Sequence, residues 1–199
     1  MLIFYDKDFC LPHLTINQLI KLVILFAILT GGAVLAADNQ SSDNHAVKRI
    51  VALSPHGVEM LFAIGAGEKI VATTDHADYP EAAKSIPRIG GYYGIQIERI
   101  IELNPDLVVV WQSGNKLEDI NQIKQLGFKV FNSDPKSLDD VASELEHLGQ
   151  LTGLQTQAYQ VAANYRTQLA DIRQQNSSKP SVKVFYQLWS TPLMTVAKG

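Results

Sequence analysis

Cysteine is nearly absent from this sequence. The one cysteine among 199 residues is Cys10, which lies inside the apolar leader described below. A chain cut after that leader has no thiol. Disulfide bonds, cysteine nucleophiles and zinc–thiolate sites are therefore excluded from its mature part.

An excess of positive charge is missing as well. The 17 lysines and arginines are outnumbered by 20 acidic residues, and the formal net charge is −3. Nucleic-acid-binding domains carry clustered basic residues, whereas here the two signs are interspersed, so we expect no nucleic-acid partner. The hydrophobic fraction of 46% suits one or two globular domains.

The sequence also lacks recognisable catalytic and metal-binding motifs. Gly65-Ala66-Gly67 begins like a dinucleotide fingerprint, but it lacks the third glycine and closes a predicted helix instead of opening one. No Ser/His/Asp set, phosphate loop or close carboxylate pair stands out. Four histidines follow the leader, and their spacing does not match a metal-binding motif: His45, His56, His76 and His147. We therefore predict that the protein is not an enzyme and has no catalytic cofactor.

The N-terminal segment has the features of an export signal. Residues 22–29 form an apolar run that follows Lys21 and precedes a stretch of small residues ending at Ala36 and Ala37. This pattern predicts a signal peptide over residues 1–37, cleaved near Ala36 or Ala37. An uncleaved anchor is the alternative, although the run is shorter than the ~20 residues of a membrane span.

The first structured unit is a βαβ motif. Residues 50–53 form a short apolar run rich in β-branched side chains, which is typical of a strand. Ser54 and Pro55 then favour a helix start, and Gly65 favours its end. Residues 70–74 form a second strand-like run. Strand, helix and strand in close succession predict a parallel sheet with helices on its faces.

The alternation of strands and helices continues along the chain. Apolar periodicity predicts helices over residues 95–103, 117–126 and 137–148. Apolar runs predict strands at residues 107–110 and 130–131, and the first of these is continuous enough to be buried on both faces. The fold class is therefore α/β, with a Rossmann-like parallel-sheet lobe over residues 38–154.

The last part of the chain has a different organisation. Residues 155–176 read as one long helix, and residues 182–188 alternate like a new strand. An isolated strand is not stable, so it either pairs elsewhere or begins a further sheet. We interpret residues 181–199 as the start of a second α/β lobe that is truncated at Gly199.

Candidate ligand-binding residues follow the strands, because ligands of open parallel sheets lie beyond the strands' carboxyl ends. The loops expected there are rich in aromatic and neutral polar groups, which suits a large, flat ligand held by stacking. Trp111 either forms a ligand wall or caps the core, and His76 either binds a metal or cofactor or hydrogen-bonds its own loop. We expect one of Tyr92 and Tyr93 to face solvent or ligand, and His56 to have a structural role at a helix start.

Two carboxylates need separate interpretation. Glu59 is expected to be a hydrogen-bonded structural group on the inner helix. Glu98 and Arg99 fall on the polar side of their helix, where they form either a surface ion pair or a contact with a partner.

Several short motifs resemble a known protein family. They are RIVALSP at 49–55 with Glu59, Asp78-Tyr79-Pro80, IERI at 97–100, LNPDLV at 103–108, and Trp111 followed by Gly114-Asn115. Together they resemble the periplasmic vitamin B12 (cobalamin)-binding proteins of ABC importers. These belong to the helical-backbone (class III) substrate-binding proteins, which also include haem and ferric-siderophore binders. The resemblance runs from Arg49 to about Lys198.

The resemblance implies a fold of two α/β lobes, with one long helix between them and the ligand in the cleft. It makes residues 155–176 the inter-lobe helix and places His76, Tyr92 and Trp111 on the N-lobe wall of a corrin pocket. Trp189 would begin the opposite wall. His76 is also a possible axial ligand of cobalt or haem iron.

The same resemblance implies the function. The protein would act in the periplasm as a monomer that captures cobalamin and delivers it to an ABC transporter permease. Glu98 would be the N-lobe carboxylate that docks on this permease. Haem or a ferric siderophore is the alternative ligand.

Overall fold

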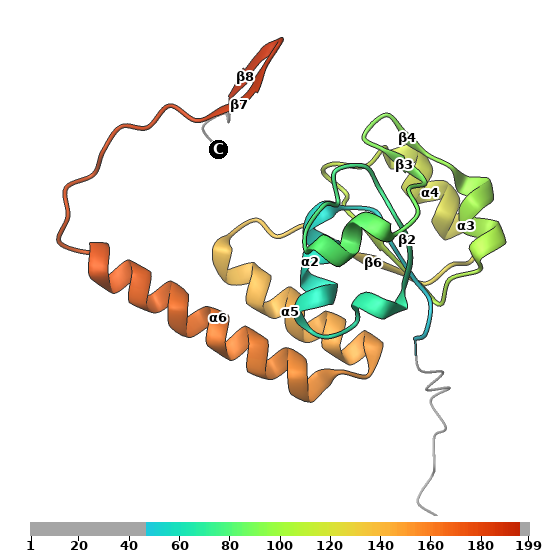
Figure 1. The fold of residues 1–199 in the computed structure, drawn as a ribbon, viewed down its shortest axis with the longest axis horizontal. Coiled ribbons are helices and arrows are strands. Elements are labelled where there is room, and N and C mark those ends of the chain that lie inside the picture. Colours follow the sequence, from blue (N-terminus) through green and yellow to red (C-terminus); the bar gives the residue numbers. More distant parts are fainter. Residues whose placement is uncertain (1–46, 196–199) are drawn as a thin grey trace, which may run out of the picture. The chain divides into compact units, whose positions relative to one another are not determined.

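A parallel sheet forms the centre of the fold (Figure 1). The computed structural model describes residues 47–195, and the predicted signal peptide lies outside this range. The strands of the sheet, in the order β2-β1-β5-β6, are β1 (Ile50–Ala52), β2 (Ile70–Thr73), β5 (Leu107–Val110) and β6 (Val130–Asn132). All three neighbouring pairs run parallel, as the sequence predicts for an α/β fold.

The two central strands are buried on both faces. Alternate residues of β1 and β5 enter two separate apolar clusters, because successive side chains of a strand point to opposite sides of the sheet. Ile50 and Val109 belong to the first cluster, which also contains residues of α2 (Pro55–Ala63), α5 (Leu138–Thr152) and α6 (Gln155–Asn176). Val51 and Val108 belong to the second, which contains residues of α3 (Ile97–Leu103) and α4 (Leu117–Gln125). The sheet therefore lies between two helical layers.

Helix α2 (Pro55–Ala63) begins as its sequence predicts. The Ser54 side chain accepts a hydrogen bond from the Gly57 N–H, and Pro55 occupies the first turn, where a missing N–H costs nothing. After the helix the chain turns through Gly65, whose φ of 84° lies in the left-handed region that glycine adopts most readily.

The other elements cover the sheet or connect its strands. They are η1 (Gly67–Lys69), η2 (Glu81–Ser85), the antiparallel pair β3 (Gly90–Gly91) and β4 (Gly94–Ile95), α3 (Ile97–Leu103), α4 (Leu117–Gln125), α5 (Leu138–Thr152) and α6 (Gln155–Asn176). The predicted helix at 95–103 starts two residues later than expected, because residue 95 pairs in β4.

Helices α5 and α6 lie side by side (Figure 1). A capping box starts α5: the Ser137 side chain accepts from the Asp140 N–H, and the Asp140 carboxylate accepts from the Ser137 N–H. Arg173 of α6 holds Asp139 of α5 with two hydrogen bonds of 2.7 and 2.9 Å. The long helix predicted at 155–176 is therefore present and fixed to the lobe, while its role as a link between two lobes stays a prediction.

The strand predicted at residues 182–188 is largely wrong. Residues 181–186 have no regular structure, and the strand β7 (Gln187–Ser190) begins only where the chain can fold back on β8 (Leu193–Thr195). The alternating side chain of Val182 is 77% exposed. An alternating pattern creates a strand only where a second strand completes its hydrogen bonds, and residues 181–186 have no such partner among the described residues.

Helix α6 has 22 residues but is polar along much of its length. Within residues 47–195, no helix combines the length and the apolar character needed to cross a bilayer.

One helix offers a test of the core. Leu148 of α5 is fully buried, whereas Leu138 on the same helix is 59% exposed. We expect Leu148→Ala to lower the free energy of unfolding by about 2–5 kcal/mol, because it removes apolar contacts and leaves a cavity. The matched control Leu138→Ala should change it by about 0.5 kcal/mol or less. Urea unfolding measures both, and equal effects would contradict the layer assignment.

Candidate ligand-binding site

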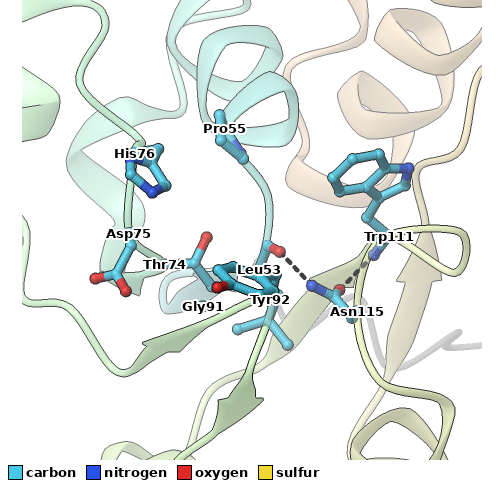
Figure 2. Close-up of a pocket in the computed structure, with 10 residues that line it drawn as sticks. Leu53, Pro55, Thr74, Asp75, His76, Gly91, Tyr92, Trp111 and Asn115 are labelled. Carbon is cyan, nitrogen blue, oxygen red and sulfur yellow. Dashed lines mark hydrogen bonds between the residues drawn. The ribbon is translucent and has the colours of Figure 1, made fainter. Parts of the chain in front are cut away.

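One pocket lies where the carboxyl ends of β1, β2 and β5 meet (Figure 2). Its volume is about 110 Å³, and it is lined by Leu53, Pro55, Thr74, Asp75, His76, Gly91, Tyr92, Trp111, Gly114 and Asn115. The chain leaves β1 towards β2 on one side and leaves β5 towards β6 on the other. Such a reversal between neighbouring strands is where open α/β sheets bind ligands. The structure thus brings together His76, Tyr92 and Trp111, three candidates from separate loops.

Trp111 begins a loop that is tightly braced. Its backbone N–H donates to the Asn115 side-chain oxygen (2.8 Å), and the Asn115 N–H donates back to the Trp111 carbonyl (2.7 Å). The Asn115 amide also donates to the Leu53 carbonyl (2.8 Å), so one side chain joins the ends of β5 and β1 (Figure 2). This bracing role of Asn115 was not foreseen from the sequence.

The indole of Trp111 lies against the backbone of Gly114. A Cβ atom at residue 114 would stand 2.0 Å from the nearest ring carbon, far inside van der Waals contact. Glycine is therefore required here for the close approach of the ring. Trp111 is half-buried and lines the pocket, so its side chain is not enclosed in the core.

His76 stands at the rim of the pocket. Its φ of 65° places it in the left-handed region, which non-glycine residues seldom occupy and which histidine tolerates better than most. The side chain is exposed and forms no hydrogen bond to any residue from 47 to 195. The alternative that His76 bonds its own loop is therefore wrong. Groups of three potential metal ligands are also absent from this part of the chain.

The turn between β3 and β4 places Tyr92 in the lining of the same pocket as His76. The Asp75 N–H donates to the Gly90 carbonyl (2.9 Å), which fastens the turn to the end of β2. The rings of Tyr92 and Tyr93 are almost perpendicular, with centroids 5.7 Å apart. Both are exposed, but only the Tyr93 hydroxyl is engaged, donating to the Asp75 carboxylate at 2.8 Å. Tyr92 lines the pocket and is 79% exposed.

The sequence matches the family model for periplasmic binding proteins over residues 50–197. The chain belongs to the periplasmic binding protein family.

Individual members of the family extend this result. A vitamin B12-binding protein of Vibrio vulnificus (strain CMCP6) is 38% identical over 151 residues, covering 76% of this chain and 55% of the relative. The structure is similar to that of the periplasmic vitamin B12 binding protein BtuF of Vibrio cholerae, with a TM-score of 0.73, 34% identity, and coverage of 76% of this chain and 59% of that one. It is also similar to the apo form of the periplasmic heme-binding protein RhuT from Roseiflexus sp. RS-1, with a TM-score of 0.63, 29% identity, and coverage of 71% and 56%. The chain thus spans a little over half the length of the relatives it matches.

The two carboxylates that were interpreted from the sequence, Glu59 and Glu98, both lie on the surface of the protein. Arg99 forms its ion pair with Glu102 at 2.5 Å, so the proposed pair between Glu98 and Arg99 is wrong. Glu98 is exposed in the first turn of α3 and has no ion pair among residues 47–195. The expectation for Glu59 is also wrong: it is exposed without a hydrogen bond in that range, because it falls on the solvent side of α2.

Two further residues, Trp189 and His56, were also singled out from the sequence. Trp189 lies in β7, where it pairs with Met194, but its side chain is outside the described part of the structure. His56 reaches beyond its helix start, because its Nε2 lies 3.1 Å from the Ser133 carbonyl and its ring contacts Trp111. Such contacts join residues far apart in sequence, and no local pattern reveals them.

Gly114 gives the first test of this site. Gly114→Ala should force the indole of Trp111 to turn, and overpacking of this kind costs about 1–3 kcal/mol of stability. The near-UV circular dichroism of tryptophan and urea unfolding report the two effects. The control Gln112→Ala, an exposed side chain of the same loop, should change neither. An unaltered spectrum in Gly114→Ala would contradict the observed ring position.

Asp75 gives a test by titration. Its carboxylate accepts the Tyr93 hydroxyl hydrogen bond, and this bond together with the negative charge raises the pKa of Tyr93 above its ordinary value. The folded state therefore holds this proton more tightly than the unfolded state, so the stabilisation is complete below pH ~10 and is lost as pH rises through the folded pKa.

Asp75→Asn should lower the pKa of Tyr93 and weaken the loss of stability above pH ~10. Ultraviolet absorbance of tyrosinate and alkaline unfolding curves measure these changes. Asp78→Asn, which removes an ion pair to Arg88 in the same loop, is the control. Equal alkaline titrations of Asp75→Asn and the parent protein would count against the hydrogen bond.

Proposed function

We propose that this protein binds cobalamin in the periplasm and passes it to the permease of an ABC transporter. The observation that carries the proposal is the convergence of His76, Tyr92 and Trp111 on one pocket at the reversal point of the sheet. The similarity to proteins named for vitamin B12 binding supports the choice of ligand.

The physical character of the pocket fits a corrin ring. The exposed ring of Tyr92 and the half-buried ring of Trp111 supply contact area to a large planar ligand, and each Å² of apolar surface removed from water contributes roughly 25 cal/mol. The lining contains a single carboxylate, Asp75, and no cation. Binding by contact area and stacking is therefore favoured over ion pairing. It requires no chemical step, so we propose a binding protein and not an enzyme.

Delivery requires surfaces beyond the pocket. We propose that Glu98 docks on the permease, since its carboxylate is exposed on α3 and is not neutralised by Arg99. We further propose that α6 connects this lobe to a second one, which would contribute Trp189 to the opposite wall of the cleft. The signal peptide predicted at 1–37, with export to the periplasm, and a monomeric state complete the proposal.

Haem is the second candidate ligand, and His76 is the observation that favours it. An exposed imidazole at a pocket rim, free of hydrogen bonds within residues 47–195, is suited to ligate haem iron or cobalt. The similarity to a heme-binding protein of known structure at 29% identity adds support.

Calorimetric titration with cyanocobalamin, and separately with hemin, tests the proposal. We expect saturable cobalamin binding that weakens by more than ~1 kcal/mol, or about fivefold, in Trp111→Ala, because a stacking anchor is lost. The control Gln112→Ala should bind like the parent protein. Equal affinity in Trp111→Ala would remove Trp111 from the site.

The same titrations separate the two ligands. Hemin binding without cobalamin binding would assign the protein to haem, and His76→Ala should then abolish the absorbance shift of the iron-bound form. Failure to bind either ligand would contradict the proposed function.

A further inference from the structure

The side chain of Trp111 needs a support that its own loop does not supply. Asn115 fixes the backbone of Trp111, and Gly114 leaves room for the ring. Neither contact sets the angle at which the indole meets a ligand. Among the side chains that the structure describes, the aromatic ring that contacts the indole is that of His56, with centroids 5.3 Å apart and planes at 86°.

His56 is itself held in place by two separate elements. It lies in the first turn of α2, and its Nε2 atom lies 3.1 Å from the Ser133 carbonyl oxygen beyond the end of β6. A carbonyl oxygen only accepts hydrogen bonds, so Nε2 must be the donor and carry a proton. The Ser54 hydroxyl lies 3.5 Å from the same nitrogen and is the weaker contact, because this distance is at the long limit of a hydrogen bond.

The Ser133 carbonyl is in turn fixed by a partly buried hydrogen-bond network. Ser133 is fully buried, its N–H donates to the Val110 carbonyl (2.8 Å), and its hydroxyl donates to the Glu144 carboxylate (2.6 Å). The other oxygen of Glu144 accepts from the Asp134 N–H (3.0 Å). Both oxygens of one carboxylate on α5 thus hold the loop that anchors His56.

We propose that His56 is a positioning residue that sets the orientation of the Trp111 indole, with Glu144 fixing the carbonyl that anchors it. The chain of contacts starts at Glu144 of α5, passes through Ser133 to the imidazole of His56, and ends at the indole of Trp111. The effect of His56 on cobalamin affinity rests on the proposed function, whereas its effect on the orientation of Trp111 does not. The orientation of Trp111 can be measured without any ligand.

A pair of substitutions separates the ring contact from the hydrogen bond. His56→Phe keeps an aromatic ring beside Trp111 but removes the donor, whereas His56→Gln keeps an N–H donor and removes the ring. The chain has two tryptophans, so a Trp189→Phe background leaves Trp111 as the only indole for spectroscopy. Fluorescence emission, acrylamide quenching and near-UV circular dichroism then report its environment directly.

We expect His56→Gln to expose the indole, with a red-shifted emission and an increase of about twofold or more in the acrylamide quenching constant. His56→Phe should shift the signal in the same direction but by less, because perpendicular aromatic packing is retained while the hydrogen bond to the Ser133 carbonyl is lost. In the protein that keeps Trp189, the cobalamin affinity of His56→Gln should fall about two- to tenfold, and that of His56→Phe should fall less. Identical spectra for the parent, Phe and Gln proteins would overturn the proposal.

Two glutamates of α5 provide the matched control for the anchor. Glu144→Gln weakens the hold on Ser133 and should shift the Trp111 spectrum in the same direction as His56→Gln. Glu146 lies on the same helix as Glu144, and Glu146→Gln removes an ion pair with Arg166 of α6, so it should leave the spectrum unchanged. Equal spectral shifts in Glu144→Gln and Glu146→Gln would show that the shift comes from general destabilisation of α5, and would overturn the role of Glu144. Absence of cobalamin binding in the parent protein would contradict the proposed function, while the spectra would still test the positioning role.

Discussion

The parallel pairing of β1 with β5 determines where everything else in the lobe can lie. Both strands are buried on both faces, so their side chains alternate between two apolar clusters and leave no room for a polar site within the sheet. Polar and aromatic groups are consequently displaced to the carboxyl ends of the strands. The Asn115 side chain closes this edge by bonding the Leu53 carbonyl, and it joins the same two strands at the point where their loops diverge.

Features that depend on neighbouring residues could be predicted from the sequence. The continuous apolar run at 107–110 indicates a doubly buried strand, and Ser54-Pro55 indicates a helix start; both are confirmed by the structure. Trp111 and His76 could be placed together because the carboxyl ends of parallel strands share one edge of a sheet. These inferences need only period, capping and topology, whereas the place of Tyr92, in the turn between β3 and β4, was predicted from the resemblance to a known family.

Features that depend on distant partners could not be predicted. The contact of His56 with Ser133 joins residues 77 positions apart, and nothing near His56 in the sequence indicates it. Glu59 was expected to be bonded, but the helix turns it to solvent. The alternating residues 182–186 illustrate the same limit, since a strand pattern specifies a conformation only when another strand is present to receive its hydrogen bonds.

The left-handed backbone at His76 has an evolutionary consequence. A φ of 65° is sterically comfortable for glycine and tolerable for asparagine, aspartate and histidine, but it is strongly disfavoured for valine, isoleucine or threonine. The backbone conformation therefore limits which amino acids can replace His76 at the pocket rim, whatever ligand is bound. Divergence towards a new ligand at this position would draw on a short list of polar side chains, unless the loop itself were rebuilt.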